Sequence, residues 1–182
     1  MIRVALDSNI LAYLAGVSRS AEDEAKIVKT RELIKRLAPT ISLVAPTQAL
    51  GELFVVLQRS GASAEEAREV LLEFAEAFGT SASETRTALS AADLAVDHKL
   101  QFWDALIVTA AADAGCTFLL SEDMQDGFIA RGLTIVNPLA AEVHPKFASL
   151  LGSELRARLA RLSPITPSIS PADVVREERD RR

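Results

Sequence analysis

Short apolar segments alternate with longer amphipathic segments along this chain. The opening letters IRVAL place Ile2, Val4 and Leu6 at alternate positions, which is the pattern of a β-strand. Three further apolar runs, ISLV, TFLL and LTIV, are equally short. Together these runs predict strands near residues 2–6, 41–44, 117–120 and 133–136.

The segments between these strands have helical periodicity. Apolar residues recur at helical spacing before Pro39, and Ser63 and Glu66 have the spacing of a capping box. The pattern predicts helices that end at Pro39, Gly61 and Gly115, one that starts at Ser63, and one over roughly 84–98. Strands that alternate with helices indicate a parallel-type α/β sandwich.

The character of the chain changes after Pro138. We therefore expect a domain over residues 1–139 and an extension over residues 140–182. The extension begins with HPKFASLLGSELRARLARL, which predicts an amphipathic helix, and continues into a Pro- and Ser-rich, highly charged segment that we expect to be a flexible tail.

Composition narrows the possible chemistry. Apolar residues make up 49% of the 182, which is typical of a globular protein. The single cysteine excludes a disulfide framework and cysteine-held zinc, and it fits a reducing cytoplasm. Two histidines supply little for imidazole chemistry, and no glycine-rich nucleotide motif occurs. Neither a signal peptide nor an apolar run of about 20 residues is present, so we expect a cytoplasmic protein without a membrane partner.

The charge is unevenly distributed. A formal net charge of −5 divides into −8 over residues 1–145 and +3 over the remainder. Phosphate contacts favour basic surfaces. A nucleic acid bound by this acidic body therefore requires cations at the contact; otherwise nucleic acid is not the partner.

Two aspartates stand beside segments that otherwise resemble protein interior. Asp7 follows the first strand, and ligands of open α/β sheets bind outside the carboxyl ends of strands. Alternatively, Asp7 or Ser8 simply caps the next helix. Asp104 has Ile107 and Val108 on its side of a predicted helix, so it needs a partner or a cation, although the helix start also favours an acid.

Two other acids are less distinctive. Glu52 points away from the apolar stripe of its helix, beside Gln48 and Arg59, and periodicity alone favours a solvated polar face over a functional role for it. Asp123 follows an apolar strand in the loop LLSEDMQDG, whereas Asp126 in the same loop has the sequence of a turn. Acids at the ends of several strands and helices, without histidine or cysteine, suit Mg²⁺ or Mn²⁺ and so favour a metal-dependent phosphodiester hydrolase.

The order LDSNILAYL, GELFVVL, QFWDALIVTAA, CTFLLSEDMQDG and GLTIVNPL resembles a PIN-domain ribonuclease of the VapC toxin type over roughly residues 1–139. The resemblance implies a three-layer α/β/α sandwich with a central parallel sheet. It also implies an acidic pocket that holds Mg²⁺ or Mn²⁺, formed by Asp7, Glu52, Asp104 and Asp123 with Asn9 and Ser121 in support. The implied activity is that of an endoribonuclease, and the implied partners are an RNA substrate, a small antitoxin and a second copy of the chain.

Two alternatives remain open at the level of sequence. One is a catalytically silent PIN-like module that binds RNA or a protein; the presence of all four expected acids favours the enzyme. The other is a phosphoacceptor receiver domain, which requires paired acids after the first strand and a lysine after a late strand. The sequence places neither correctly. The extension after residue 139 exceeds the length that the resemblance implies.

Overall fold

A computed structural model describes residues 2–18 and 20–152, and the predicted flexible tail lies outside them. The strands are β1 (Arg3–Leu6), β2 (Ser42–Pro46), β3 (Gly79–Ser81), β4 (Phe118–Leu120), β5 (Ile129–Ala130) and β6 (Leu133–Val136). The helices are α1 (Ser8–Ala15), α2 (Ala21–Leu37), α3 (Thr47–Arg59), α4 (Ala64–Ala77), α5 (Thr85–His98) and α6 (Phe102–Asp113), and residues 145–152 are also helical. Among the described residues, no helix is long and apolar enough to cross a membrane.

The six strands form one sheet in the order β3-β2-β1-β4-β6-β5. Every neighbouring pair is parallel except β5 with β6. The four strands predicted from apolar runs are confirmed. The two edge strands, β3 and β5, were not predicted, because the β3 sequence GTS contains no apolar residue and β5 is only two residues long.

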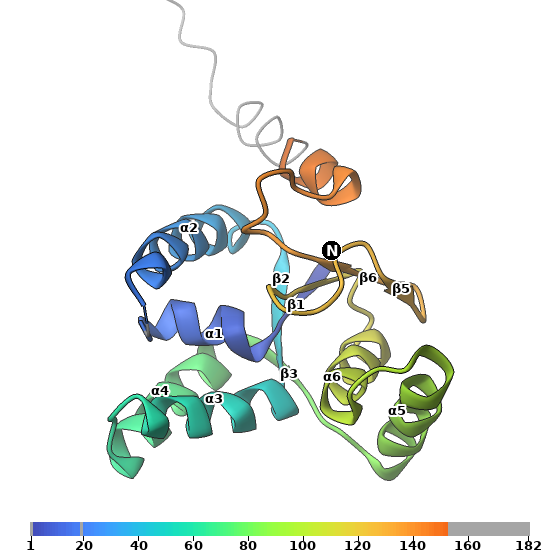
Figure 1. Ribbon diagram of the computed structural model, residues 1–182, viewed down its shortest axis with the longest axis horizontal. Helices are drawn as coiled ribbons and strands as arrows, with labels where there is room; N and C mark the ends of the chain where they lie inside the picture. The colour runs from blue at the N-terminus through green and yellow to red at the C-terminus, as the bar shows by residue number, and fades with distance from the viewer. Residues whose placement is uncertain (1, 19, 153–182) are drawn as a thin grey trace, which may run out of the picture.

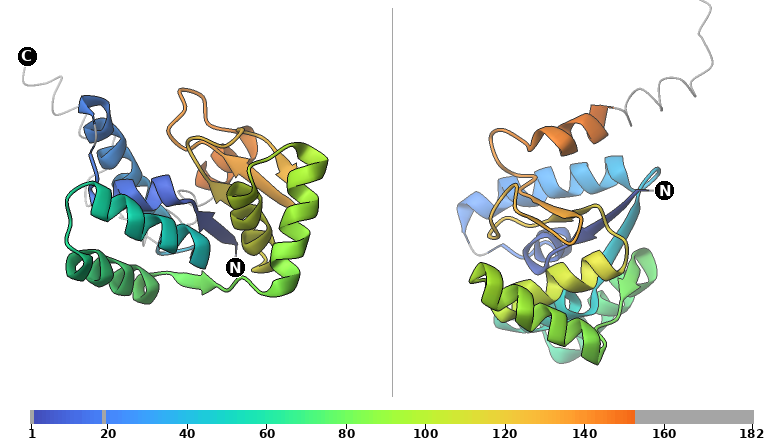
Figure 2. Two further views of the ribbon diagram at one scale, coloured as in Figure 1. Left: turned by 60° about the horizontal axis from the view of Figure 1, so that its bottom comes forward. Right: turned by 90° about the vertical axis from the view of Figure 1, so that its right-hand side faces the viewer.

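Helices cover both faces of the sheet, which confirms the three-layer α/β/α architecture. In Figure 1, α3, α4, α5 and α6 lie on one side of the sheet and α2 lies on the other. The helix over residues 145–152 is on the same side as α2, as the right-hand view of Figure 2 shows. Helix α1 contacts both α2 and α3 and thus joins the two helical layers.

Local signals explain where several helices begin and end. Ser63 and Glu66 form the predicted capping box of α4, with a Ser63 N–H to Glu66 Oε2 distance of 2.8 Å. A second capping box, between Ser20 and Asp23, starts α2. Gly115 follows α6 with a φ of +72°, a conformation that turns the chain sharply into β4.

The central strands are fully buried. Val4, Ala5 and Leu6 of β1 and Leu119 and Leu120 of β4 have no exposed surface, as expected for parallel strands covered on both faces. Asp7 and Asp123, which follow β1 and β4, are therefore attached to a fully buried part of the sheet.

The chain after the last strand contributes to the same core. Phe147 is completely buried, and its ring meets that of Phe118 edge-to-face at a centroid distance of 5.4 Å. Leu150 is also buried. Part of the predicted extension thus packs on the sheet; the placement of a domain boundary at residue 139 stays a prediction.

We predict that Phe147→Ala lowers the free energy of unfolding of the full chain by about 3 kcal/mol, because it removes a buried ring and leaves a cavity. Leu89→Ala, at a side chain that is 65% exposed on α5, should change the same quantity by no more than about 0.5 kcal/mol. Urea unfolding followed by circular dichroism measures both variants. Equal effects would mean that the helix over residues 145–152 adds nothing to the stability of the body.

Candidate active site

The pairing of β1 with β4 brings two segments of the chain together at the carboxyl end of the sheet. Leu6 pairs with Leu120, so Asp7 and Ser121 follow on adjacent strands. The chain leaves β1 toward β2 on one side and β4 lies on the other side, which makes this edge the switch point of the sheet. Sequence periodicity placed each residue at a strand end; the strand order makes them neighbours.

Hydrogen bonds connect the side chains at this edge. The hydroxyl of Ser121 lies 2.7 Å from Asp7 Oδ2 and 3.0 Å from Asp123 Oδ1. Asn9 Nδ2 donates to Asp123 Oδ1 at 2.6 Å and to Asp7 Oδ2 at 3.2 Å. Asn9 and Ser121 therefore hold the two carboxylates side by side through neutral donors.

Asp7 is both a helix cap and a buried acid. It is the N-cap residue of α1, and its Oδ1 accepts the N–H of Ser8 at 2.7 Å. Only 2% of the surface of Asp7 is exposed. Burial raises the pKa of Asp7 to about 7, and the nearby charges of Asp123 and Glu52 add to this increase, while hydrogen bonds from Ser121 and Ser8 oppose it.

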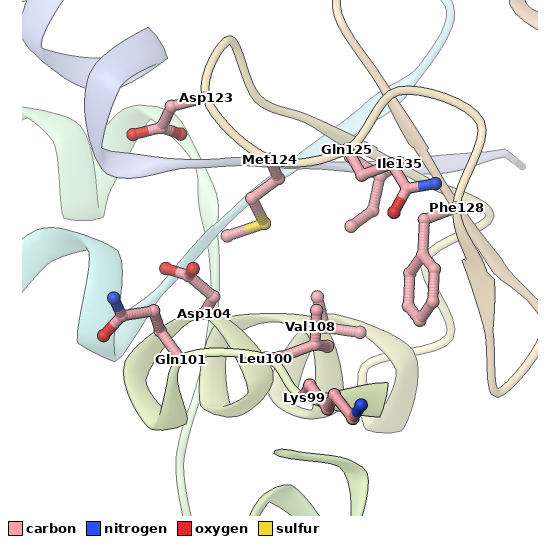
Figure 3. Close-up of a pocket in the computed structure, with 10 residues that line it drawn as sticks. All are labelled: Lys99, Leu100, Gln101, Asp104, Val108, Asp123, Met124, Gln125, Phe128 and Ile135. Carbon is pink, nitrogen blue, oxygen red and sulfur yellow. The ribbon is translucent and has the colours of Figure 1, made fainter. Parts of the chain in front are cut away.

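Asp104 enters the same region from the first turn of α6. Burial raises its pKa, and the negative charges of Asp123 and Glu52 raise it further. Asp104 and Asp123 line one cavity of about 220 Å³, together with Gln101 and Met124. Figure 3 shows their two side chains on the same side of this cavity, with the Asp104 carboxylate pointing up from its helix toward the Asp123 loop.

Glu52 lies on α3, and Gln48 Nε2 is 3.3 Å from its Oε1. Its charge acts on both Asp7 and Asp104, although no hydrogen bond joins it to either. Asp126, interpreted from sequence as a turn residue, accepts the backbone N–H of Asn137 at 2.7 Å. The structure therefore brings four acids from four parts of the chain into one electrostatic cluster: Asp7, Glu52, Asp104 and Asp123.

The donor chemistry of this cluster fits a hard divalent cation. All four ligand candidates are carboxylates, and within residues 2–18 and 20–152 no lysine or arginine forms an ion pair with any of them. No three of the described acidic, histidine or cysteine side chains are arranged as a ready-made metal cage. Mg²⁺ usually keeps several waters and takes only one or two protein carboxylates, so an open cluster suits it.

Sequence reasoning missed the residues that hold the Asp123 loop. Lys26 Nζ lies 2.5 Å from Glu122 Oε1 and 3.4 Å from the hydroxyl of Tyr13, which itself donates to Glu122 Oε2. The hydrogen bond to Glu122 is the main cause of a raised Lys26 pKa. On the other side of the loop, Asn137 Nδ2 donates to the carbonyl of Glu122 at 3.3 Å. No sequence signal pointed to Glu122, because its partners come from α1 and α2.

This arrangement defines an α/β/α protein with a carboxylate site at the switch point of its sheet. The sequence model of the PIN domain family matches residues 4–128, which is more than half of the chain. The chain therefore belongs to the PIN domain family.

Solved structures of VapC-type proteins share the fold. VapBC2 from Rickettsia felis, bound to a promoter DNA fragment, is 15% identical with a TM-score of 0.51, over 67% of this chain and 89% of that one. VapC20 of Mycobacterium tuberculosis, a sarcin–ricin loop cleaving toxin, is 17% identical with a TM-score of 0.53, over 66% and 91%. DNA-bound VapBC from Salmonella typhimurium is 19% identical with a TM-score of 0.52, over 74% and 97%. No curated protein matches the sequence.

Asp7→Asn should stabilise the metal-free protein at neutral and alkaline pH. The folded-state pKa of Asp7 is about 7, above its ordinary value of 3.8, so the native state favours the neutral acid. This contribution to stability is complete below about pH 4 and is lost as the pH rises through about 7. The stability of the variant minus that of the wild type should therefore grow between about pH 4 and pH 8, by roughly 2–4 kcal/mol.

Urea unfolding in chelator at several pH values measures this difference. Asp97→Asn, which removes the same charge from an exposed position on α5, is the matched control for the loss of one carboxylate. A difference for Asp7→Asn that stays constant with pH would contradict the raised pKa of Asp7.

Proposed function

We propose that the protein is a metal-dependent endoribonuclease that hydrolyses RNA phosphodiester bonds. The observation that carries this proposal is the cluster of Asp7, Glu52, Asp104 and Asp123, which lacks a cationic partner in the described part of the chain. Clustered carboxylates raise one another's pKa until a cation offsets them. Membership of the PIN domain family supports the same assignment.

The four acids divide into two roles in this proposal. Asp7, Asp104 and Asp123 would hold Mg²⁺ or Mn²⁺, and Glu52 would hold the ion or orient the attacking water. When bound, such an ion supplies Lewis acidity and offsets negative charge on the phosphate. Ser121 and Asn9 keep Asp7 and Asp123 oriented through the hydrogen bonds described above. The reaction is in-line attack of water on phosphorus, with cleavage of one phosphorus–oxygen bond of the RNA backbone.

We expect purified full-length protein to cleave a mixed, structured RNA pool with Mg²⁺ or Mn²⁺ and to leave it intact in excess chelator. Asp104→Asn should reduce the cleavage rate by at least about 100-fold, since it removes a metal ligand while retaining the size of the side chain. Asp97→Asn, an acid on the exposed face of α5, should cleave at the wild-type rate.

Full activity in both Asp7→Asn and Asp104→Asn would contradict the assignment of the site. Absence of cleavage by folded wild-type protein with either metal, on RNA that includes ribosomal RNA, would instead favour the catalytically silent binding module.

We further propose that the protein is the toxin of a VapBC-type pair, acting in the cytoplasm as a homodimer and inhibited by a small antitoxin. The structural likeness to a toxin–antitoxin complex from Klebsiella pneumoniae supports this, at 18% identity and a TM-score of 0.53. A nuclease that must be inhibited by a partner should be harmful when it is made alone.

Induced expression of the wild type without a partner should therefore arrest the growth of a bacterial host, whereas Asp104→Asn made at the same level should not. Colony counts and optical density after induction measure the effect. Normal growth with a wild-type protein that cleaves RNA in vitro would identify a stand-alone nuclease rather than a toxin.

A further inference from the structure

One side of α3 carries a stripe of residues that the hydrophobic core does not use. Leu50, Leu53 and Leu57 of this helix are buried, and the opposite side presents Gln48, Glu52, Val55 and Arg59. The stripe starts at the acidic cluster with Glu52 and reaches Arg59 two helical turns later, about 10 Å along the axis.

A hollow of about 410 Å³ runs along this stripe, and we call it the α3 groove. Its walls come from α3 and from the first turns of α1 and α6, and they include Ser8, Gln48, Glu52, Val55, Arg59 and Trp103. Helix α3 contacts α6, and Figure 1 shows α3 beside the lower end of α6. Ser8 follows Asp7, and Trp103 precedes Asp104. Glu52, one of the four acids of the cluster, lines the groove, so the groove adjoins the candidate active site.

Trp103 is unusually open for a side chain of its size, with 55% of its surface exposed. The ring of Phe102 meets it edge-to-face at a centroid distance of 5.1 Å. Val55, also exposed at 43%, lines the groove with it. An exposed indole ring in an open groove provides a flat surface on which a nucleic-acid base can stack.

Arg59 gives the groove a positive end. It is the single cationic residue among the described residues that line the groove, and it forms no ion pair within residues 2–18 and 20–152. It also lines an adjoining hollow of about 210 Å³ with Ser18 and Ser60. An arginine on an otherwise acidic body, with no carboxylate partner in the described part of the chain, is suited to a phosphate.

We propose that the α3 groove binds a single-stranded segment of the RNA next to the cleaved bond, with one base stacked on Trp103 and a backbone phosphate at Arg59. This inference rests on the proposed ribonuclease function and adds the two side chains, Trp103 and Arg59, that would contact the substrate. RNA with unstacked bases is recognised by aromatic stacking, whereas a duplex hides its base faces. The groove offers a stacking surface and a cation in line with the acidic cluster, where a phosphate must arrive.

Trp103 is the only tryptophan of the chain, so its fluorescence reports on this groove alone. The probe is a single-stranded RNA of about 12 nucleotides without self-complementarity, a length within the usual range of single-strand sites. With chelator present to prevent cleavage, the RNA should quench the tryptophan fluorescence of the full chain in a saturable manner. A duplex of the same sequence should quench it much less.

Fluorescence anisotropy of the same RNA, carrying a fluorescent label, measures the RNA affinity of each variant. Trp103→Ala should weaken binding roughly 5- to 100-fold, and Trp103→Phe should recover part of that loss because it keeps a stacking ring. Arg59→Gln should weaken binding and lower the slope of log affinity against log salt by about 0.7, as expected for one lost phosphate contact on a single strand. The matched controls are Leu89→Ala on α5 and Arg36→Gln on α2, both at exposed positions; the former should bind as the wild type does.

Arg36→Gln distinguishes a local phosphate contact from general charge, because it removes the same charge far from the groove. If Arg36→Gln and Arg59→Gln change affinity and salt slope equally, the proposal is wrong. It is also wrong if Trp103→Ala binds RNA normally but changes a dimer into a monomer by sedimentation, since the groove would then be an interface between copies of the chain.

The proposal for the α3 groove and the ribonuclease proposal can be rejected independently of each other. RNA binding that depends on Trp103 and Arg59, in a wild type that never cleaves, would support the groove and reject the enzyme. Metal-dependent cleavage with the same KM in the wild type, Trp103→Ala and Arg59→Gln would support the enzyme and reject the groove.

Discussion

The parallel pairing of β1 with β4 is the constraint on which the site depends. It fixes Asp7 beside Ser121 at the carboxyl end of a fully buried strand pair. An ionised carboxylate in that position is costly unless donors or a cation compensate it. Ser121, Ser8 and Asn9 supply hydrogen bonds, but Asp123 and Glu52 add like charge, and the pKa of Asp7 is raised despite those donors. The fold thus holds an acid in a state that a cation would relieve.

Lys26 forms an ion pair with this loop, but outside the acidic cluster. Lys26 pairs with Glu122, whose neighbours Ser121 and Asp123 both belong to the site. With Tyr13 and Asn137, this contact anchors the backbone of the loop from two sides. A lysine placed directly against Asp123 would neutralise it and compete with any metal ion. Because Lys26 instead pairs with the neighbouring Glu122, it positions the loop, and no described residue forms an ion pair with Asp123.

Local patterns were sufficient to predict the four strands with apolar runs, the helix starting at Ser63 and the position of Asp7 at a strand end. They could not predict the strand order, because periodicity identifies elements but contains no information on which elements pair. Glu52 illustrates the limit: its spacing on α3 correctly placed it away from the core, yet only the contact of α3 with its neighbours brings its charge near Asp7 and Asp104. The importance of Glu122 was equally hidden, since Tyr13 and Lys26 are about a hundred residues away in sequence.

The uneven distribution of charge has a physical consequence for any polyanionic substrate. The body as a whole repels phosphate, with a formal charge of −8 over residues 1–145. Long-range attraction therefore cannot draw RNA to this site, and binding must rely on contacts at short range. The contacts proposed above are stacking on the exposed Trp103 ring, a phosphate contact with Arg59, which forms no ion pair among the described residues, and a divalent ion that the carboxylate cluster would hold. A site built in this way disfavours RNA that cannot present an open base and a phosphate together, so the same acidity that weakens general affinity also increases selectivity.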